Sequence, residues 1–220
     1  SSQYDSVPYV GIHDTHEFAE RVRKYKDRGI SRAILLDGPP GSGKSTFLRA
    51  YVRHIGGHLM VVPPDFLNSM GRAEISNFVT ALRPDVILFD DLDRAADGLV
   101  PAMDLIENLR RKYPQMLISS TCNQIADTNA ALLRPGRLGV RVKFLAPNDD
   151  DKLALLKLYM SEYGVDDSEF DLPALLADMK HANFTHDYVR FVAEEAIVQN
   201  QAELLETIKN AQEFLEMIED

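Results

Sequence analysis

A glycine-rich segment, Gly38-Pro-Pro-Gly-Ser-Gly-Lys-Ser-Thr46, has the residue types and the spacing that are needed to bind phosphate. Its glycines let the backbone curve around an anion with the N–H groups pointing inward, and a helix that follows adds positive potential. The Lys44 ammonium can reach the terminal phosphates of a nucleotide, and the Ser45 hydroxyl can bind Mg²⁺. We therefore expect ATP and Mg²⁺ as cofactors, rather than a chance glycine–proline turn. The cofactor-binding residues expected here are Pro40, Gly41, Ser42, Gly43, Lys44, Ser45 and Thr46.

An acidic pair, Asp90-Asp91, follows the apolar run Val86–Phe89. If this run is a strand, both carboxylates lie at its C-terminal end, where open α/β sheets bind their ligands. We expect Asp90 to bind Mg²⁺ through the water shell of the metal, and Asp91 to be a catalytic residue that orients or activates the attacking water. For the pair taken alone, the alternative is a solvated acidic turn. Asp93 is expected to be a turn or helix-cap residue.

The elements that must position these residues alternate along residues 1–146. Short apolar runs predict strands at 33–37, 58–62, 86–91, 116–123 and 141–144, and apolar residues at helical spacing predict helices at 17–28, 44–55, 72–82 and 98–112. Strands that alternate with helices of this length indicate a parallel sheet with helices on both faces. The sequence therefore predicts an α/β domain.

The period changes to helical spacing alone from Asn148 onward, which predicts a small α-helical domain with helices at 149–163, 172–181, from 185 to 200 or beyond, and 203–219. The charge changes at the same place. Residues 1–146 hold 19 Lys and Arg against 16 Asp and Glu, whereas residues 147–220 hold 5 against 18. We therefore expect a large domain over 1–146 and a small one over 147–220.

A polar residue after the fourth predicted strand, Asn123, is followed eleven residues later by Arg134-Pro-Gly-Arg137. Together with the two motifs above, these residues resemble the AAA family of ATPases. The resemblance implies that Asn123 is the sensor-1 residue, which helps to position water at the γ-phosphate. It implies that Arg134 and Arg137 are arginine fingers, which are catalytic residues that act on ATP held by a neighbouring subunit. Taken without the other motifs, the two arginines would instead indicate an exposed turn with surface charge. It therefore implies a ring of identical chains, for which we expect a hexamer.

The resemblance covers most of the chain and implies the fold of the family: a five-stranded parallel sheet sandwiched by helices, followed by a small α-helical lid domain. Gly11 and Ile12 stand where the family lays its backbone against adenine. His186 stands where the small domain approaches the base, so it could contact adenine or ribose, and an ordinary exposed histidine is the alternative. For Arg190 we expect a surface salt bridge more than a sensor role.

Three positions depart from the family pattern. Asp91 stands where the family usually has glutamate, and its shorter side chain would set the carboxylate back from the water. An acid pair that ends in aspartate is similar to that of the mitochondrial AAA translocases that move the Rieske protein. Ser69 stands where threading motors carry an aromatic residue, for which Phe66 or Met70 could substitute. Gly139 stands where the family often has aspartate.

The composition limits the setting. The single cysteine, Cys122, excludes an internal disulfide and fits a cytoplasmic or other reducing compartment. The apolar runs are far shorter than the roughly 20 residues that cross a membrane. No secretory signal is visible, and a start at Ser1 without methionine suggests that a targeting segment or a further domain has been removed.

These features favour an ATPase that forms a ring and remodels or translocates a macromolecule, which we expect to be a protein. A second hypothesis is a slow nucleotide-gated switch or scaffold, because Asp91 and Ser69 both depart from a strong motor. A DNA-associated loader is the third, although a net charge of −10 and the lack of a recognisable DNA-binding motif speak against nucleic acid. A small-molecule kinase is the fourth hypothesis, and the Arg-Pro-Gly-Arg segment speaks against it, because such enzymes lack this segment.

Overall fold

The computed structural model describes residues 15–69, 71–95, 99–123, 138, 140–180 and 184–217. Within these ranges the chain divides into two compact units. One is built from the residues up to Gly38 and from Lys44–Phe144, and the other from Pro39–Gly43 together with the residues from Leu145 onward. Each unit is described by itself below, and the predicted boundary at 146/147 stays a prediction.

The first unit contains a five-stranded sheet in which every neighbouring pair is parallel. Its strands are β1 (Ala33–Asp37), β2 (Leu59–Val62), β3 (Val86–Phe89), β4 (Leu117–Cys122) and β5 (Val140–Lys143), in the spatial order β2-β3-β4-β1-β5. The three middle strands are buried along their whole length. This is why their sequences are continuous apolar or small-residue runs rather than alternating ones. The sheet confirms the predicted α/β fold class.

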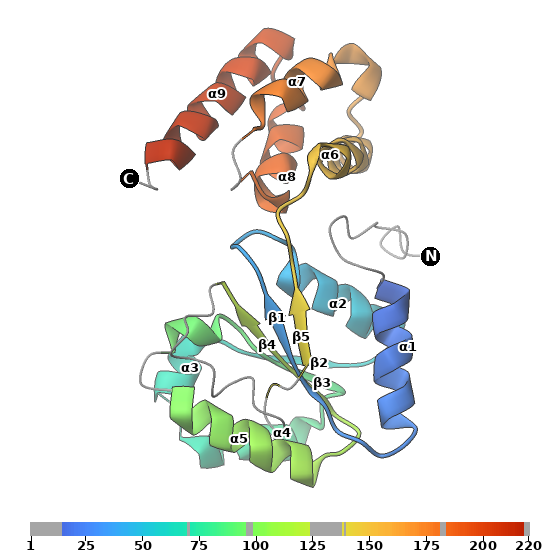
Figure 1. Ribbon diagram of the computed structural model, residues 1–220, viewed down its shortest axis with the longest axis vertical. Coiled ribbons are helices and arrows are strands. Elements are labelled where there is room, and N and C mark those ends of the chain that lie inside the picture. Colours follow the sequence, from blue (N-terminus) through green and yellow to red (C-terminus); the bar gives the residue numbers. More distant parts are fainter. Residues whose placement is uncertain are drawn as a thin grey trace. The chain divides into compact units, whose positions relative to one another are not determined.

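Helices cover both faces of this sheet (Figure 1). They are α1 (Thr15–Lys26), α2 (Lys44–His54), α3 (Pro64–Ser69), α4 (Arg72–Leu82) and α5 (Leu99–Lys112). Figure 1 shows α1 and α2 on one side of the sheet and α3, α4 and α5 on the other. The core on the latter side joins Ile75 and Val79 of α4 with Ile106 of α5 and with Ile87 and Phe89 of β3. The short helix α3, which sequence periodicity does not indicate, begins at Pro64, since proline is preorganised for a first helical position.

The second unit is helical, with α6 (Asp149–Tyr163), α7 (Leu172–Asp178), α8 (His186–Glu195) and α9 (Gln201–Met217). The Asn148 side chain accepts a hydrogen bond from the Asp151 backbone N–H and so caps α6. The unit has its own apolar core, which contains Leu156, Leu175 and Phe184. The helices confirm the predicted α-helical lid. Within the described residues, no helix combines the length and the apolar character that a membrane span would need.

The expected helix from residue 185 to 200 or beyond is wrong in its length, because α8 ends at Glu195 and α9 begins at Gln201. The Asn200 side chain accepts hydrogen bonds from the backbone N–H groups of Ala202 and Glu203, and the Glu203 carboxylate accepts one from Asn200 N. This capping box starts a new helix, and the side chain–backbone bonds of Asn200 compete with continuation of the old one.

Candidate nucleotide-binding site

The glycine-rich loop joins β1 to α2, so the helix begins at Lys44, directly behind the segment expected to hold phosphate. Gly41 and Gly43 have left-handed backbones, with φ of +70° and +87°, which side-chain-bearing residues rarely adopt. At Gly38, a Cβ atom would lie 2.3 Å from the carbonyl oxygen of Phe144. The glycines are therefore required by the path of the backbone, and the positive end of the helix dipole at the start of α2 suits an anion.

Lys44 is buried, with 6% of its surface exposed. Its Nζ donates to the carbonyl oxygen of Gly38 at 2.7 Å and to Oδ1 of Asn123 at 2.9 Å. Burial lowers the pKa of Lys44, and the nearby carboxylates of Asp91, Asp93 and Asp37 oppose that shift. The ammonium thus stands at the centre of a cluster of oxygen atoms, where a phosphate could replace one of its present acceptors.

Asp90 is bound on two sides by hydroxyl groups. Its Oδ1 accepts from Oγ1 of Thr121 at 2.6 Å and from Oγ of Ser45 at 3.2 Å. A hydroxyl and a carboxylate oxygen at this spacing are hard ligands of the kind that Mg²⁺ prefers, and the metal usually completes its shell with water and phosphate. Ser45 and Asp90 therefore fit the metal that the sequence predicts at this place.

Asp91 is held by Asn123 and Arg94. The Asn123 Nδ2 donates to Asp91 Oδ1 at 3.1 Å, and Arg94 Nη1 lies 3.4 Å from Asp91 Oδ2. Because Oδ1 of Asn123 accepts from Lys44, the two neighbours together fix which end of the amide is oxygen and which is nitrogen. The backbone of Asp91 is left-handed, with φ of 44°, a conformation that aspartate tolerates better than most residues.

The strand order explains why these residues meet. β4 lies between β3 and β1, so Asn123 after β4 stands between the acid pair after β3 and the end of β1. In the β3–β4 register Phe89 pairs with Ser120, which brings Asp90 beside Thr121. The structure thus brings together Lys44, Ser45, Asp90, Asp91 and Asn123, as the sequence predicts.

The sequence reasoning missed two residues at this site, Thr121 and Arg94. Thr121 bonds Asp90 and also accepts from the Asp91 backbone N–H at 2.8 Å, so it fixes both members of the acid pair. A threonine two residues before Asn123, at the end of a predicted strand, was the available signal. Arg94 has no such signal, because its ion pair depends on the turn after β3. Asp93, expected as a turn residue, lies in the short 3₁₀ helix Leu92–Arg94 and accepts from the Asn123 backbone N–H at 3.2 Å.

Residues Pro39–Gly43 of the glycine-rich loop belong to the helical unit. The Asp187 backbone N–H donates to the carbonyl oxygen of Gly41 at 3.3 Å, and a Cβ atom on Gly41 would lie 2.4 Å from Thr185 Oγ1. His186 is 7% exposed and its ring faces Gly43, so the alternative of an ordinary exposed histidine is wrong. Arg190 pairs with Glu194 at 3.3 Å on the surface of α8, as the salt-bridge interpretation expected.

Several predicted residues lie outside the described part of the chain. They are Gly11, Ile12, Met70, Arg134, Arg137 and Gly139. Pro40, Ser42 and Thr46 lie in the described part. Ser42 is fully buried in the loop, and Thr46 belongs to the first turn of α2.

Comparison with known proteins shows several ATPases among the relatives. The chain is 29% identical over 169 residues to Cell division control protein 48 homolog B of Arabidopsis thaliana, an alignment that covers 66% of this chain and 28% of that protein. It is 29% identical over 205 residues to Ribosome biogenesis ATPase RIX7 of Saccharomyces cerevisiae, covering 81% and 24%. It is 26% identical over 152 residues to 26S proteasome regulatory subunit S10B homolog B of Arabidopsis thaliana, covering 59% and 38%. The chain thus spans less than two fifths of the length of each of these relatives.

A family model settles the class of protein. The model described as "ATPase family associated with various cellular activities (AAA)" matches residues 34–145, which is half of the chain. This range begins in β1 and ends just after β5, so it contains the glycine-rich loop, the acid pair and Asn123. The chain therefore belongs to the AAA family and is an ATPase module of that family.

Proposed function

We propose that this chain binds ATP with Mg²⁺ at the carboxyl ends of β1, β3 and β4 and hydrolyses the ATP. In this proposal the chain is one member of a ring of six identical chains, and the ring remodels or translocates a protein. The observation that carries the proposal is the hydrogen-bonded series Lys44–Asn123–Asp91. It connects the cation suited to the terminal phosphates with the carboxylate suited to the attacking water. Asn123 therefore contacts both the Lys44 ammonium and the Asp91 carboxylate.

The residues of the chain divide the work of phosphoryl transfer among them. When bound, ATP supplies the phosphoryl group, and Mg²⁺ neutralises the charge on its oxygens. Lys44 gives up one of its present acceptors and stabilises the negative charge that spreads over the transferred group. Ser45 and Asp90 hold the metal, directly and through its water shell. Asp91 accepts a hydrogen bond from the attacking water and takes its proton as the water oxygen bonds to the γ-phosphorus, while the bond from that phosphorus to the β,γ-bridging oxygen breaks and ADP leaves.

Ring formation is proposed because Arg134 and Arg137 match the arginine fingers of the family, which act on ATP in a neighbouring subunit. A guanidinium there would offset the charge on the transferred phosphoryl group.

Gly11, Ile12 and His186 are proposed to contact the adenosine part of the nucleotide. The buried free cysteine, Cys122, agrees with a reducing compartment such as the cytoplasm. The net charge of −10 favours a protein partner over nucleic acid.

The trans-acting role of the arginines can be tested by mixing variants. One chain carries Arg134→Ala and Arg137→Ala, and the other carries Lys44→Ala. Each variant alone should have little activity, because the first lacks fingers and the second cannot bind ATP. Mixed, they should recover turnover where an intact site meets intact fingers. Light scattering during the same titration should show a ring. If the mixture stays inactive while both variants co-assemble, the fingers do not act between subunits.

A second function, a slow nucleotide-gated switch, is favoured by one observation. The Asp91 side chain is shorter than that of glutamate, and its carboxylate is held by Arg94 as well as by Asn123. Under this hypothesis Arg94 restrains hydrolysis, and Arg94→Gln should raise the turnover of the assembled protein. An exposed ion pair of this kind is worth about 1 kcal/mol at most, so the increase should be no more than about fivefold. Unchanged or reduced turnover in Arg94→Gln would count against the switch.

A further inference from the structure

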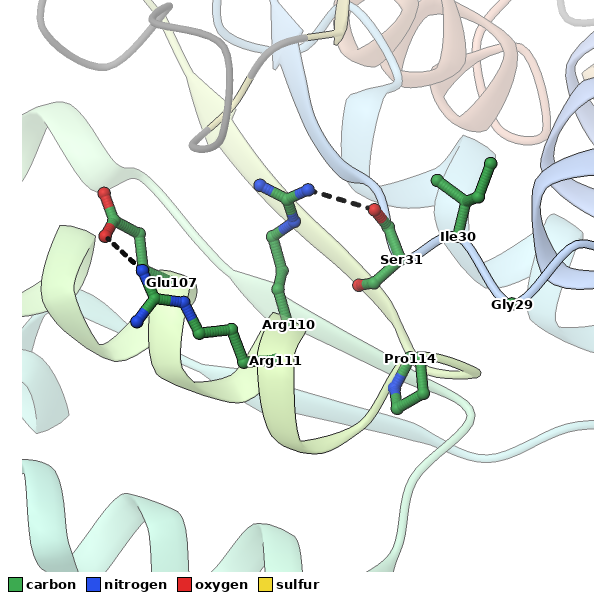
Figure 2. A pocket seen from close by; sticks show the side chains of 7 residues that line it. All are labelled: Gly29, Ile30, Ser31, Glu107, Arg110, Arg111 and Pro114. Carbon is green, nitrogen blue, oxygen red and sulfur yellow. Dashed lines mark hydrogen bonds and ion pairs between the residues drawn. The ribbon is translucent and has the colours of Figure 1, made fainter.

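A pocket lies at the edge of the sheet opposite to the nucleotide-binding site, beside the N-terminal ends of β1 and β4 (Figure 2). Its volume is about 660 Å³, within the range of roughly 300–1,000 Å³ that is common for ligand sites. The residues before β1, the last turns of α5 and the turn before β4 form its walls. The lining residues are Gly29, Ile30, Ser31, Glu107, Arg110, Arg111 and Pro114.

Positive charge dominates this region. Arg110 and Arg111 line the pocket, and a narrow neighbouring pocket, which shares Ile30 and Pro114 with it, adds Lys26 and Arg32. Against these four cations the two pockets present one carboxylate, Glu107, whose Oε2 lies 3.9 Å from Arg111 Nη2. Burial and the neighbouring Arg32 guanidinium both lower the pKa of Arg110. In a chain of net charge −10, this is a local excess of cations.

Several hydrogen-bond donors lie in this pocket and in its narrow neighbour. Arg110 Nη2 donates to the carbonyl oxygen of Ser31 at 3.1 Å, and Figure 2 shows its guanidinium extended toward Ser31. The buried Oγ of Ser31 and, in the narrow neighbouring pocket, the buried Nε of Arg32 make no hydrogen bond with the described residues. A guanidinium can only donate, so a ligand that satisfies this region must bring acceptor atoms.

We propose that this pocket binds an acidic side chain of a partner polypeptide, with the carboxylate beside Arg110 and Ser31 and with the exposed Arg111, now paired with Glu107, adding positive charge. Planar guanidinium groups match a carboxylate through paired hydrogen bonds. The pocket is much larger than one small anion requires. Ile30, which is 39% exposed, offers an apolar contact to an aliphatic residue next to the acid. The chemistry that fits is therefore a short segment in which an acidic residue neighbours an aliphatic one.

This site would be separate in function from the nucleotide site, so peptide binding and ATP hydrolysis can succeed or fail independently. The probe is a fluorescein-labelled octapeptide of alternating glutamate and leucine, with a glutamine–leucine peptide as its uncharged match. Fluorescence anisotropy with the full chain at low salt measures the dissociation constant of each. The glutamate peptide should bind about tenfold or more tightly than the glutamine peptide, because it adds charge-assisted hydrogen bonds.

Variants of the chain locate the binding. Arg110→Gln should weaken binding of the glutamate peptide about tenfold, and Arg111→Gln, on an exposed side chain, should weaken it several-fold without risk to folding. Lys24→Gln, which removes an exposed charge from α1 at a residue that lines neither pocket, is the matched control and should leave the affinity unchanged. Thermal unfolding of each variant identifies any loss that comes from misfolding.

Three outcomes would overturn the proposal. The first is equal affinity for the glutamate and glutamine peptides. The second is a glutamate-peptide affinity that is the same in Arg111→Gln as in the unchanged chain, or that falls as much in Lys24→Gln. The third is variant-dependent binding of inorganic phosphate, measured by calorimetry, without binding of the glutamate peptide, which would make the pocket a site for a small anion.

Discussion

The Arg141 side chain of β5 binds the carboxylate of Asp37, the last residue of β1, with its Nε 2.9 Å from Oδ2 of Asp37. Asp37 is 4% exposed and stands directly before the glycine-rich loop. Its charge also acts on Lys44, whose pKa it helps to raise against the effect of burial. The loop that is suited to phosphate thus begins at a buried negative charge, and Arg141 is the group that neutralises it.

Removal of Arg141 should therefore weaken ATP binding. In Arg141→Gln the Asp37 carboxylate is left without its cation and repels the phosphates, and the free energy of unfolding should fall by roughly 1–3 kcal/mol. Nucleotide affinity by calorimetry and unfolding in urea measure the two effects.

The double variant Asp37→Asn with Arg141→Gln separates charge from shape. It keeps two side chains of similar size but removes both charges, so it should recover most of the lost ATP affinity. If the double variant binds ATP as poorly as Arg141→Gln alone, the pair matters only for packing.

Lys44 should give ATP binding an alkaline limit. Its pKa is lowered by burial, so it loses its proton at a pH where an ordinary lysine stays charged. Since the charged form binds phosphate, ATP affinity should fall as pH rises through that lowered pKa. Stability should change in the opposite direction. Between the folded and unfolded pKa values the unfolded chain holds more protons, so the free energy of unfolding rises with pH.

Lys44→Arg is the control for this pH dependence, because a guanidinium keeps its proton throughout the alkaline range. Its ATP affinity, whatever its value near neutrality, should lack the alkaline fall. Parallel pH profiles for the unchanged chain and Lys44→Arg would show that another group titrates.

Thr121 should support metal binding without touching the nucleotide. Thr121→Val keeps the shape of the side chain but removes the hydroxyl that bonds Asp90 and accepts from the Asp91 N–H. The Mg²⁺ concentration for half-maximal turnover should rise by roughly tenfold or more, as for loss of one hydrogen bond to a charged group, which is worth about 1.5–3 kcal/mol. Thr121→Ser, which retains the hydroxyl, should stay close to the unchanged chain, and an equal rise in both variants would contradict the role of the hydroxyl.

The sequence was sufficient for features that depend on neighbouring residues. The apolar run of β3 and the glycine-rich loop predict their own elements, because strand burial and backbone curvature act over a few residues. The relation of Asp37 to Arg141 was out of reach, since the two are 104 positions apart and meet only because β5 pairs with β1.

The same limit applies within the nucleotide-binding site. Thr121 lies beside Asp90 because β4 pairs with β3 in one particular register, which the sequence does not state. The break between α8 and α9 was missed for another reason, because the apolar spacing continues through it while the Asn200 capping box starts a new helix at Gln201. Side-chain hydrogen bonds to the backbone decide such boundaries, and periodicity does not detect them.

In the proposed function, Asp91 acts on the attacking water while Lys44 and the loop bind ATP. The most direct measurement is turnover beside ATP affinity for Asp91→Asn in the assembled protein, with Asp91→Glu as the partner that keeps the acid. The amide of Asp91→Asn can still accept from Asn123 but cannot take a proton. We predict ATP affinity within a few-fold of the unchanged chain and turnover lower by about a hundredfold or more, with activity retained in Asp91→Glu. Turnover in Asp91→Asn that matches the unchanged chain, or ATP affinity that falls in proportion to turnover, would contradict this account.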